Sequence, residues 1–152
     1  MKRMGLWAAL AAAAAAVAVW AQTQQVGMQV SVASMPPVVV ATVPRAGDTQ
    51  ADPNLAEIRV TFSKEMMTEA MWSWAMVSAE TFPRITGQAR FLEDRRTCAA
   101  PVKLEPGRAY AVWFNTGDLK AFRDTGNRPA VPYLLVFETA QAKPIGPPGE
   151  GN

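Results

Sequence analysis

The stretch LEPGRAY, Leu104 to Tyr110, carries the strongest indication of fold in this sequence. Pro106 and Gly107 fit the two central positions of a type II turn, because proline presets φ and glycine accepts a positive φ. Tyr110 follows on the strand that leaves the turn. A tyrosine so placed keeps its ring in the core while its hydroxyl bonds to the backbone of the turn, an arrangement called a tyrosine corner. The stretch therefore predicts a structural role for these three residues, and not a catalytic tyrosine.

Short segments with a hydrophobic period of two lie on both sides of this turn. They are residues 58–62, 108–114 and 133–137, and each places apolar side chains on one face. This period is typical of half-buried strands. Only residues 64–70 and 118–123 fit even a turn or two of helix, so the crossover helices of a parallel α/β fold are missing. We therefore predict an all-β antiparallel sandwich of about seven strands.

The first 21 residues have the pattern of a secretory signal peptide. Two basic residues precede an unbroken, mostly alanine apolar run, and Val19-Trp20-Ala21 offers small residues at the positions that signal peptidase reads. The alternative is a single membrane anchor, but the run is short beside the roughly 20 residues that a spanning helix needs. We predict cleavage after Ala21, export to the periplasm or the cell exterior, and no stable membrane span in the mature chain.

The rest of the chain divides by composition. Residues 22–35 are expected to form a linker and residues 36–139 a folded sandwich, which has the usual size of one small domain. Residues 140–152 are rich in proline and glycine and nearly lack apolar side chains, which predicts a disordered tail.

The composition excludes several classes of function. The sequence contains no histidine, which rules out Ser-His-Asp and Cys-His catalysis and histidine-ligated zinc or copper. Loss of Lys2 and Arg3 with the signal peptide leaves the remainder of the 15 basic residues balanced against the 13 acidic ones. A neutral mature chain gives no reason to expect nucleic acid or an anionic membrane as a partner.

Cys98 is the single cysteine, so no disulfide can form within the chain. It lies in a predicted strand, residues 97–102, where a buried, inert thiol is favoured over a disulfide-linked dimer. The fold must therefore be held by its apolar core or with help from a neighbour.

Four motifs stand in order along the chain. They are PPVVVATVPRAGD (Pro36–Asp48), IRVTFSKEM (Ile58–Met66), LEPGRAY (Leu104–Tyr110) and FRDTGNRPAVPYLLVFET (Phe122–Thr139). Together they resemble the SbsA-type bacterial Ig-like domain, with its opening strand, its Phe-Ser-x-x-Met strand end, its Leu-x-Pro-Gly-x-x-Tyr corner and its Asp-x-x-Gly loop before the last strand. The resemblance implies an Ig-like β-sandwich module of secreted and cell-surface bacterial proteins, without catalytic residues.

Three tryptophans are the candidate ligand-contacting residues. Trp72 and Trp74 share one strand face if their segment is extended, and Trp113 lies on the opposite face of its strand from the corner tyrosine. Core packing is the favoured interpretation, because a tryptophan on the third strand of an Ig-like sandwich is usually internal. The alternative is an exposed aromatic platform that stacks on a sugar or a peptide, for which Trp113 is the better candidate.

Two further groups of side chains have ligand chemistry. Adjacent Met66 and Met67 offer thioethers to Cu(I), but the methionines are spread along a chain without histidine, and a core or cap role is favoured. Asp118, Asp124 and Asn127 offer oxygens to Ca²⁺ within one loop, yet their spacing is not that of an EF-hand. A structural turn is the favoured interpretation of that loop.

Ser63 and Lys64 are the best remaining pair for catalysis, but adjacent residues on a strand point to opposite faces. We therefore predict no catalytic, metal or cofactor site. The expected function is that of a non-enzymatic structural or interaction module of the cell envelope, whose partner is an envelope protein or a glycan. The alternative is a carbohydrate- or peptide-binding module that uses the tryptophans.

Overall fold

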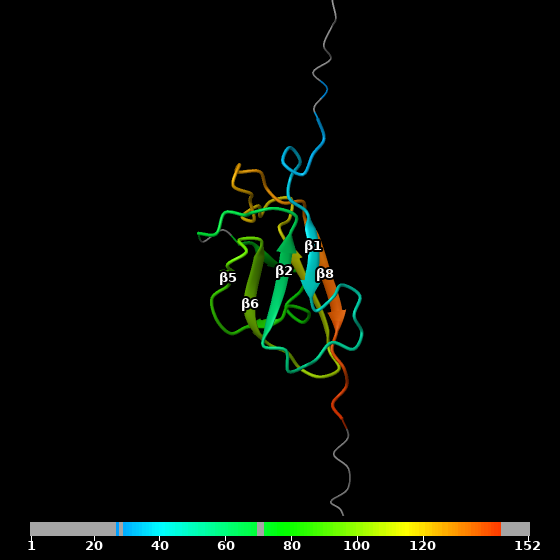
Figure 1. The fold of residues 1–152 in the computed structure, drawn as a ribbon. Helices are drawn as coiled ribbons and strands as arrows, with labels where there is room; N and C mark the ends of the chain where they lie inside the picture. The colour runs from blue at the N-terminus through cyan, green and yellow to red at the C-terminus, as the bar shows by residue number, and fades with distance from the viewer. Residues whose placement is uncertain (1–26, 28, 70–71, 144–152) are drawn as a thin grey trace, which may run out of the picture.

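The computed structural model describes residues 27, 29–69 and 72–143 (Figure 1). In this part of the chain eight β-strands form two sheets, and there is no helix. The predicted all-β antiparallel sandwich is confirmed. The predicted signal peptide and residues 144–152 of the predicted tail lie outside the described residues. Within the described ranges no helix is long and apolar enough to cross a membrane.

The short helices considered for residues 64–70 and 118–123 do not form in the part of the chain that the structure describes. Met67, for example, donates its backbone N–H to the carbonyl of Arg123 at 2.8 Å. A helix would need that donor for its own ladder, so bonds between distant loops override the local helical preference.

The first sheet has the strand order β1–β2–β6, with a broken edge strand beyond β6. Its strands are β1 (Val39–Val43), β2 (Glu57–Phe62), β6 (Thr97–Lys103), β4 (Arg84–Ile85) and β5 (Arg90–Phe91). Both β4 and β5 pair with β6. Between them, a Cβ on Gly87 would lie only 3.1 Å from the Cγ atom of Pro101. Glycine therefore allows the edge to stay close to β6 at this point.

The second sheet has the order β3–β7–β8, formed by β3 (Trp74–Met76), β7 (Ala109–Phe114) and β8 (Tyr133–Glu138). After β1 the chain turns at Gly47 and follows β8 (Figure 1). Gly47 donates its N–H to the carbonyl of Val136 at 2.8 Å, and Ala51 donates to Glu138 at 3.0 Å. Ala51 also forms a parallel bridge with Thr139. This segment joins the two sheets and covers the outer edge of β8.

Alternating residues from both sheets meet in one core, as the period of two predicts. The largest side chains with at most 1% of their surface exposed include Ile58, Val60, Phe62, Val112, Phe114, Phe122, Leu135 and Phe137. Phe122 comes from the loop between β7 and β8, and its ring centroid lies 5.0 Å from that of Phe62 and 6.2 Å from that of Phe114. Burial of one such side chain contributes about 1.5–3 kcal/mol, so apolar packing can hold the sandwich without a disulfide.

The LEPGRAY stretch connects β6 to β7. The backbone N–H of Glu105 donates to the hydroxyl of Tyr110 at 2.8 Å, and Tyr110 is 2% exposed. The tyrosine ring stacks on Phe137 with 5.3 Å between centroids. Gly107 has a φ of 64°, which favours glycine, and donates its N–H to the carbonyl of Ala140 at 2.9 Å. The turn thus holds both the core tyrosine and the segment that leaves β8.

Candidate functional site

Asp124 is the buried charged residue of the described chain, with 1% of its side chain exposed. Its carboxylate accepts hydrogen bonds from the backbone N–H groups of Gly126 and Arg128 at 3.0 and 2.8 Å. It also accepts from Lys64 Nζ and from Arg128 Nε, each at 3.0 Å. Burial by itself raises the pKa of Asp124, but these donors outweigh burial and hold the pKa below its usual range.

These contacts account for the loop that the sequence offered as a calcium site. The bond from the Gly126 N–H to the Asp124 carboxylate makes an Asx turn, and Asn127 adopts a positive φ of 63° that closes the loop. Asp118 is exposed. Within the described ranges there is no group of three or more Asp, Glu, Cys or His suited to a metal ion. Two of the four donors to the Asp124 carboxylate are backbone N–H groups of its own loop, the arrangement expected of a structural turn.

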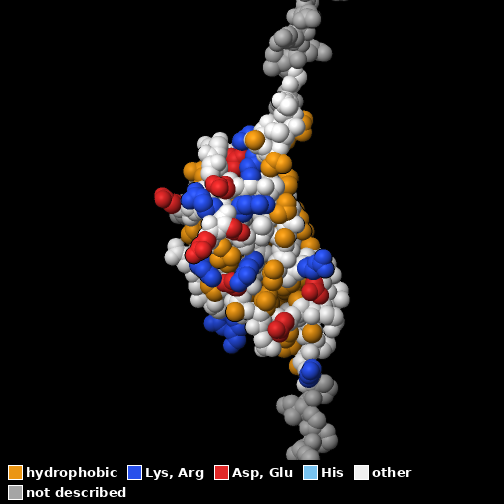
Figure 2. Space-filling model, viewed as in Figure 1, with side chains coloured by type: hydrophobic (Ala, Val, Ile, Leu, Met, Phe, Trp, Pro, Cys, Tyr) orange, Lys and Arg blue, Asp and Glu red, His pale blue; other side chains and the backbone are white. Residues whose placement is uncertain are grey.

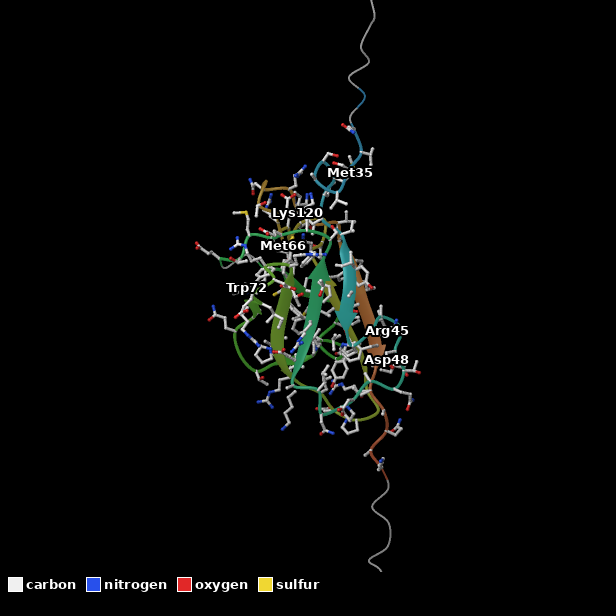
Figure 3. The ribbon with its side chains drawn as sticks, viewed as in Figure 1. Met35, Arg45, Asp48, Met66, Trp72 and Lys120 are labelled. Carbon is white, nitrogen blue, oxygen red and sulfur yellow. The ribbon has the colours of Figure 1, made fainter. Side chains whose placement is uncertain are left out.

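The same ion-pair cluster, Lys64, Asp124 and Arg128, holds the segment that precedes β1. Lys64 Nζ donates to the carbonyls of Ala33 and Met35, and Arg128 Nη1 donates to the carbonyl of Ser34 at 2.8 Å. Residues 33–35 are therefore fixed against one end of the sandwich, where Figure 3 labels Met35.

Ser63 and Lys64 are not arranged as a catalytic pair. The Ser63 hydroxyl accepts a hydrogen bond from the N–H of Val38 at 3.1 Å, at the start of β1. The Lys64 amine is paired with the Asp124 carboxylate, with 3.0 Å between Nζ and Oδ2. A general base needs a neutral amine within reach of the hydroxyl, and the structure directs the two groups to different partners.

Trp72 and Trp74 are half-buried and pack against the core. The ring of Trp74 meets that of Phe114 edge-on, with 4.9 Å between centroids. Met76 shares the strand face of Trp74 but is 60% exposed, because it lies at the free edge of the sheet. Core packing therefore describes both Trp72 and Trp74. Of the three candidate tryptophans, only Trp113 is left as the centre of an aromatic platform for a ligand.

Trp113 lies on the outer face of the second sheet. We call the outward-pointing residues of this sheet the apolar sheet face: Ala75, Ala111, Trp113, Leu134 and Val136. Trp113 is half-buried between its cross-strand neighbours Ala75 and Leu134. Leu134 is 37% exposed and Val136 43% exposed. Contiguous apolar surface of this kind marks contact sites on many soluble proteins.

The outer face of the first sheet has the opposite character. The Glu57 carboxylate lies between Arg59 and Arg90, with oxygen–nitrogen distances of 2.6 and 2.9 Å. The two arginines stand on either side of Ala99, which is fully buried. Figure 2 shows this face, where basic and acidic side chains are interspersed. Both arginines are thus held by one carboxylate, so this face is polar where the outer face of the second sheet is apolar.

Cys98 is buried in β6, as predicted for the strand 97–102. Burial raises the pKa of the Cys98 thiol to about 12, against the opposing influence of the Trp74 indole and of Arg90. The thiolate is the nucleophilic form of cysteine. A buried thiol with this pKa is therefore inert at neutral pH.

A hollow of about 440 Å³ opens between the free edges of β3 and β4. Its apolar lining consists of Met76, Ala79, Phe82, Pro83, Ile85 and Tyr110, and its charged lining of Arg84, Lys103, Glu105 and Arg108. Sequence reasoning missed this feature, as it missed the pairing of Lys64 with Asp124. In both cases the residues come from separate elements, and residues 84–85 are too short a strand for a periodic signal.

The chain was compared with known proteins. A family model described as a bacterial Ig-like domain matches residues 33–139. Among solved structures, the S-layer protein rSbsC and the surface layer protein SbsC, domains 1-6, are similar to this chain, each with 18% sequence identity and a TM-score of 0.48. Each match covers 73% of this chain and 14% of the other chain, so this chain spans a small part of those proteins. No curated protein matches it. From the family match, which includes both sheets of the sandwich, the chain belongs to the bacterial Ig-like domain family.

Proposed function

We propose that this chain is an exported, non-enzymatic structural module of the bacterial cell envelope that holds its two flanking segments apart and contacts an envelope partner. The observation that carries the proposal is the path of the chain. Residues 29–35 approach one end of the sandwich, and residues 140–143 leave at the opposite end (Figure 1). A rigid sandwich with this path acts as a spacer between whatever adjoins its two ends.

Both ends of the spacer are bonded to the sandwich. On the entry side, Lys64 and Arg128 hold the carbonyls of residues 33–35. On the exit side, Ala140 donates its N–H to the carbonyl of Ala51 at 2.9 Å and accepts from Gly107. Bonded ends transmit orientation as well as distance, which is what a structural module requires.

The titratable groups support a non-enzymatic role. Four carboxylates of the described chain have a pKa below the usual range: Glu57, Glu80, Asp94 and Asp124. Burial opposes this shift in Glu57, Asp94 and Asp124, and hydrogen-bond donors outweigh it. A carboxylic acid that acts as a general acid needs its pKa raised toward neutrality. These four carboxylates are shifted the other way.

Export and the finer family type belong to the same proposal. The signal peptide pattern of residues 1–21 supports release into the periplasm or outside the cell. The order of the four motifs between Pro36 and Thr139 supports the SbsA type within the bacterial Ig-like family. The balanced charge of the mature chain supports a protein or glycan partner over a nucleic acid.

A distance measurement tests the spacer. Nitroxide labels on Val32→Cys and Lys143→Cys report the separation of the two ends by double electron–electron resonance, and the buried Cys98 does not compete for label. The seven-residue β6 alone is about 23 Å long at 3.3 Å per residue, so we expect one narrow distance distribution above that value. A Lys64→Met, Arg128→Met variant should broaden it while circular dichroism shows an intact fold. A broad or shorter distribution in the wild-type domain would refute the spacer.

Capture of partners from the native envelope tests the second part of the proposal. The mature chain, coupled through a C-terminal tag, should retain a specific envelope protein or glycan polymer. An Asp118→Asn variant, changed at an exposed position outside the sheets, serves as the matched control. Recovery of cytoplasmic proteins only, equally with both baits, would count against an envelope role.

The apolar sheet face favours a second candidate, a peptide- or carbohydrate-binding module centred on Trp113. The half-buried indole beside Leu134 and Val136 supports this alternative. A glycan array and a display library of peptides are the test. We expect Trp113→Ala to remove any binding found, and Val40→Ala, at another exposed apolar position, to leave it unchanged. Absence of binding by the wild-type domain would reject this candidate and leave the spacer untouched.

A further inference from the structure

The hollow between β3 and β4 lies where both sheets end. β3 is the terminal strand of the second sheet, and β4 is terminal in the first, so neither has an outer neighbour among the described residues. The free side of such a strand presents unpaired backbone N–H and C=O groups that can pair with another chain. The opposite edge of the sandwich differs, because there the segment 47–51 bonds to β8.

The charges at this hollow are not balanced. Arg84 and Lys103 stand directly opposite each other across β4 and β6. Like charges in this register repel, and neither has an acidic partner within the described chain. The one acidic side chain of the hollow, Glu105, is paired with Arg108. The rim therefore carries two cations that an outside anion can neutralise.

The apolar wall of the hollow suits side chains better than sugar rings. Met76 is 60% exposed and Ile85 36% exposed, and Phe82 and Pro83 complete the wall. Methionine adapts its shape to varied apolar groups. None of the three candidate tryptophans lines the hollow, so the flat indole that commonly stacks on a sugar is missing from this wall.

We propose that this hollow binds an extended acidic peptide segment of a partner protein. The segment adds as a strand along β4, places an apolar side chain against Met76 and Phe82, and places a carboxylate at Arg84 and Lys103. Strand addition supplies affinity through main-chain bonds, and side-chain pockets supply specificity. This site is separate from the apolar sheet face and does not depend on the spacer function.

The test uses a defined probe, the peptide acetyl-Val-Glu-Val-Glu-Val-amide, and its glutamine counterpart. We expect amide chemical shifts of the ¹⁵N-labelled domain to change at residues 84–86 and 102–105 when the glutamate peptide is added. The glutamine peptide should bind more weakly, and added salt should weaken the glutamate peptide alone. A glutamate peptide that is N-methylated at every residue keeps its charge but has no residue N–H to donate to β4, and it should lose binding.

Matched charge variants separate the site from a general attraction. Arg84→Gln, Lys103→Gln should reduce affinity about three- to tenfold, the range for two exposed ion pairs. Arg45→Gln, Lys120→Gln removes the same charge from two exposed positions that do not line the hollow, both labelled in Figure 3, and it should leave affinity unchanged. Thermal unfolding by circular dichroism confirms that both variants fold.

Several outcomes would overturn the proposal. One is the absence of shifts at β4 and β6 with the peptide at millimolar concentration. Another is an equal loss of affinity in both double variants, or equal binding of the glutamine peptide. A third is a result in which neither glutamate peptide binds but polygalacturonate, a carboxylated polysaccharide, shifts the same amide signals. That result would assign the site to a glycan.

Discussion

Replacement of Asp124 tests what the ion-pair cluster contributes to the fold. Asp124→Ala removes four hydrogen bonds, two from backbone N–H groups and two from charged side chains. It leaves Lys64, whose side chain is 14% exposed, without a counter-charge, although its carbonyl partners in residues 33–35 are retained. Arg128 is 41% exposed and can turn to water.

The expected magnitude follows from burial. Removing one partner of a buried ion pair costs about 3–5 kcal/mol of folding stability. Because Arg128 can be hydrated once Asp124 is gone, we expect the lower end of this range, about 3 kcal/mol. Asp124→Asn keeps an acceptor for the backbone N–H groups and loses the charge, for which we expect about 2 kcal/mol. The alanine variant should therefore lower the melting temperature by roughly 12–24 °C, at about 4–8 °C per kcal/mol for a domain of this size.

Glu57→Gln is the matched control. Glu57 is also paired with two basic side chains, but Arg59 and Arg90 are 48% and 55% exposed. Pairs with exposed partners contribute about 0–1 kcal/mol, so the control should be mild. Urea unfolding followed by tryptophan fluorescence measures all three variants, and the denaturant dependence of the free energy should stay constant. If Glu57→Gln destabilises as much as Asp124→Asn, burial is not what makes the cluster strong.

Three further predictions follow from the same structure. Because the folded-state pKa of Asp124 is lowered, its contribution to stability is complete above the usual aspartate pKa of about 3.9 and is lost as the pH falls through the folded-state value; the stability difference between wild type and Asp124→Asn should shrink over that range in urea titrations. Cys98 should resist maleimide labelling in the native domain and react fully in concentrated guanidinium chloride, since the thiol is buried; rapid native labelling would contradict its burial. Tyr110→Phe should cost about 1 kcal/mol through the lost bond from the Glu105 N–H, whereas Tyr133→Phe should change unfolding by less than about 0.5 kcal/mol; equal losses would refute the corner bond.

Strands that alternate along their whole length were predictable, because the period of apolar side chains can be seen in a few consecutive residues. Residues 58–62 and 133–137 alternate between core and surface, so a period of two reveals both their conformation and their buried face. The short edge strands were not predictable in this way. β4 has two residues, and it exists because Pro101 and its neighbours in β6 offer a partner at the correct distance.

The loop helices considered for residues 64–70 and 118–123 failed for a related reason. Helical preference is a weak local term of a few tenths of a kcal/mol per residue. At Met67 this helical preference competes with a backbone hydrogen bond to the carbonyl of Arg123, which is far along the chain. Hydrogen bonds between two packed loops contribute more than the helical preference of either loop, so no helix forms.

Local patterns were enough to predict the all-β sandwich, the buried faces of its alternating strands and the turn at Pro106 and Gly107, because alternation and turn chemistry act over a few neighbouring residues. Which polar residues meet depends instead on how distant parts of the chain are brought together. Lys64 and Asp124 are 60 positions apart, and Arg84 faces Lys103 through strand register alone. Such pairs depend on how strands align across a sheet and how loops close over its ends, and that alignment is a property of the whole core.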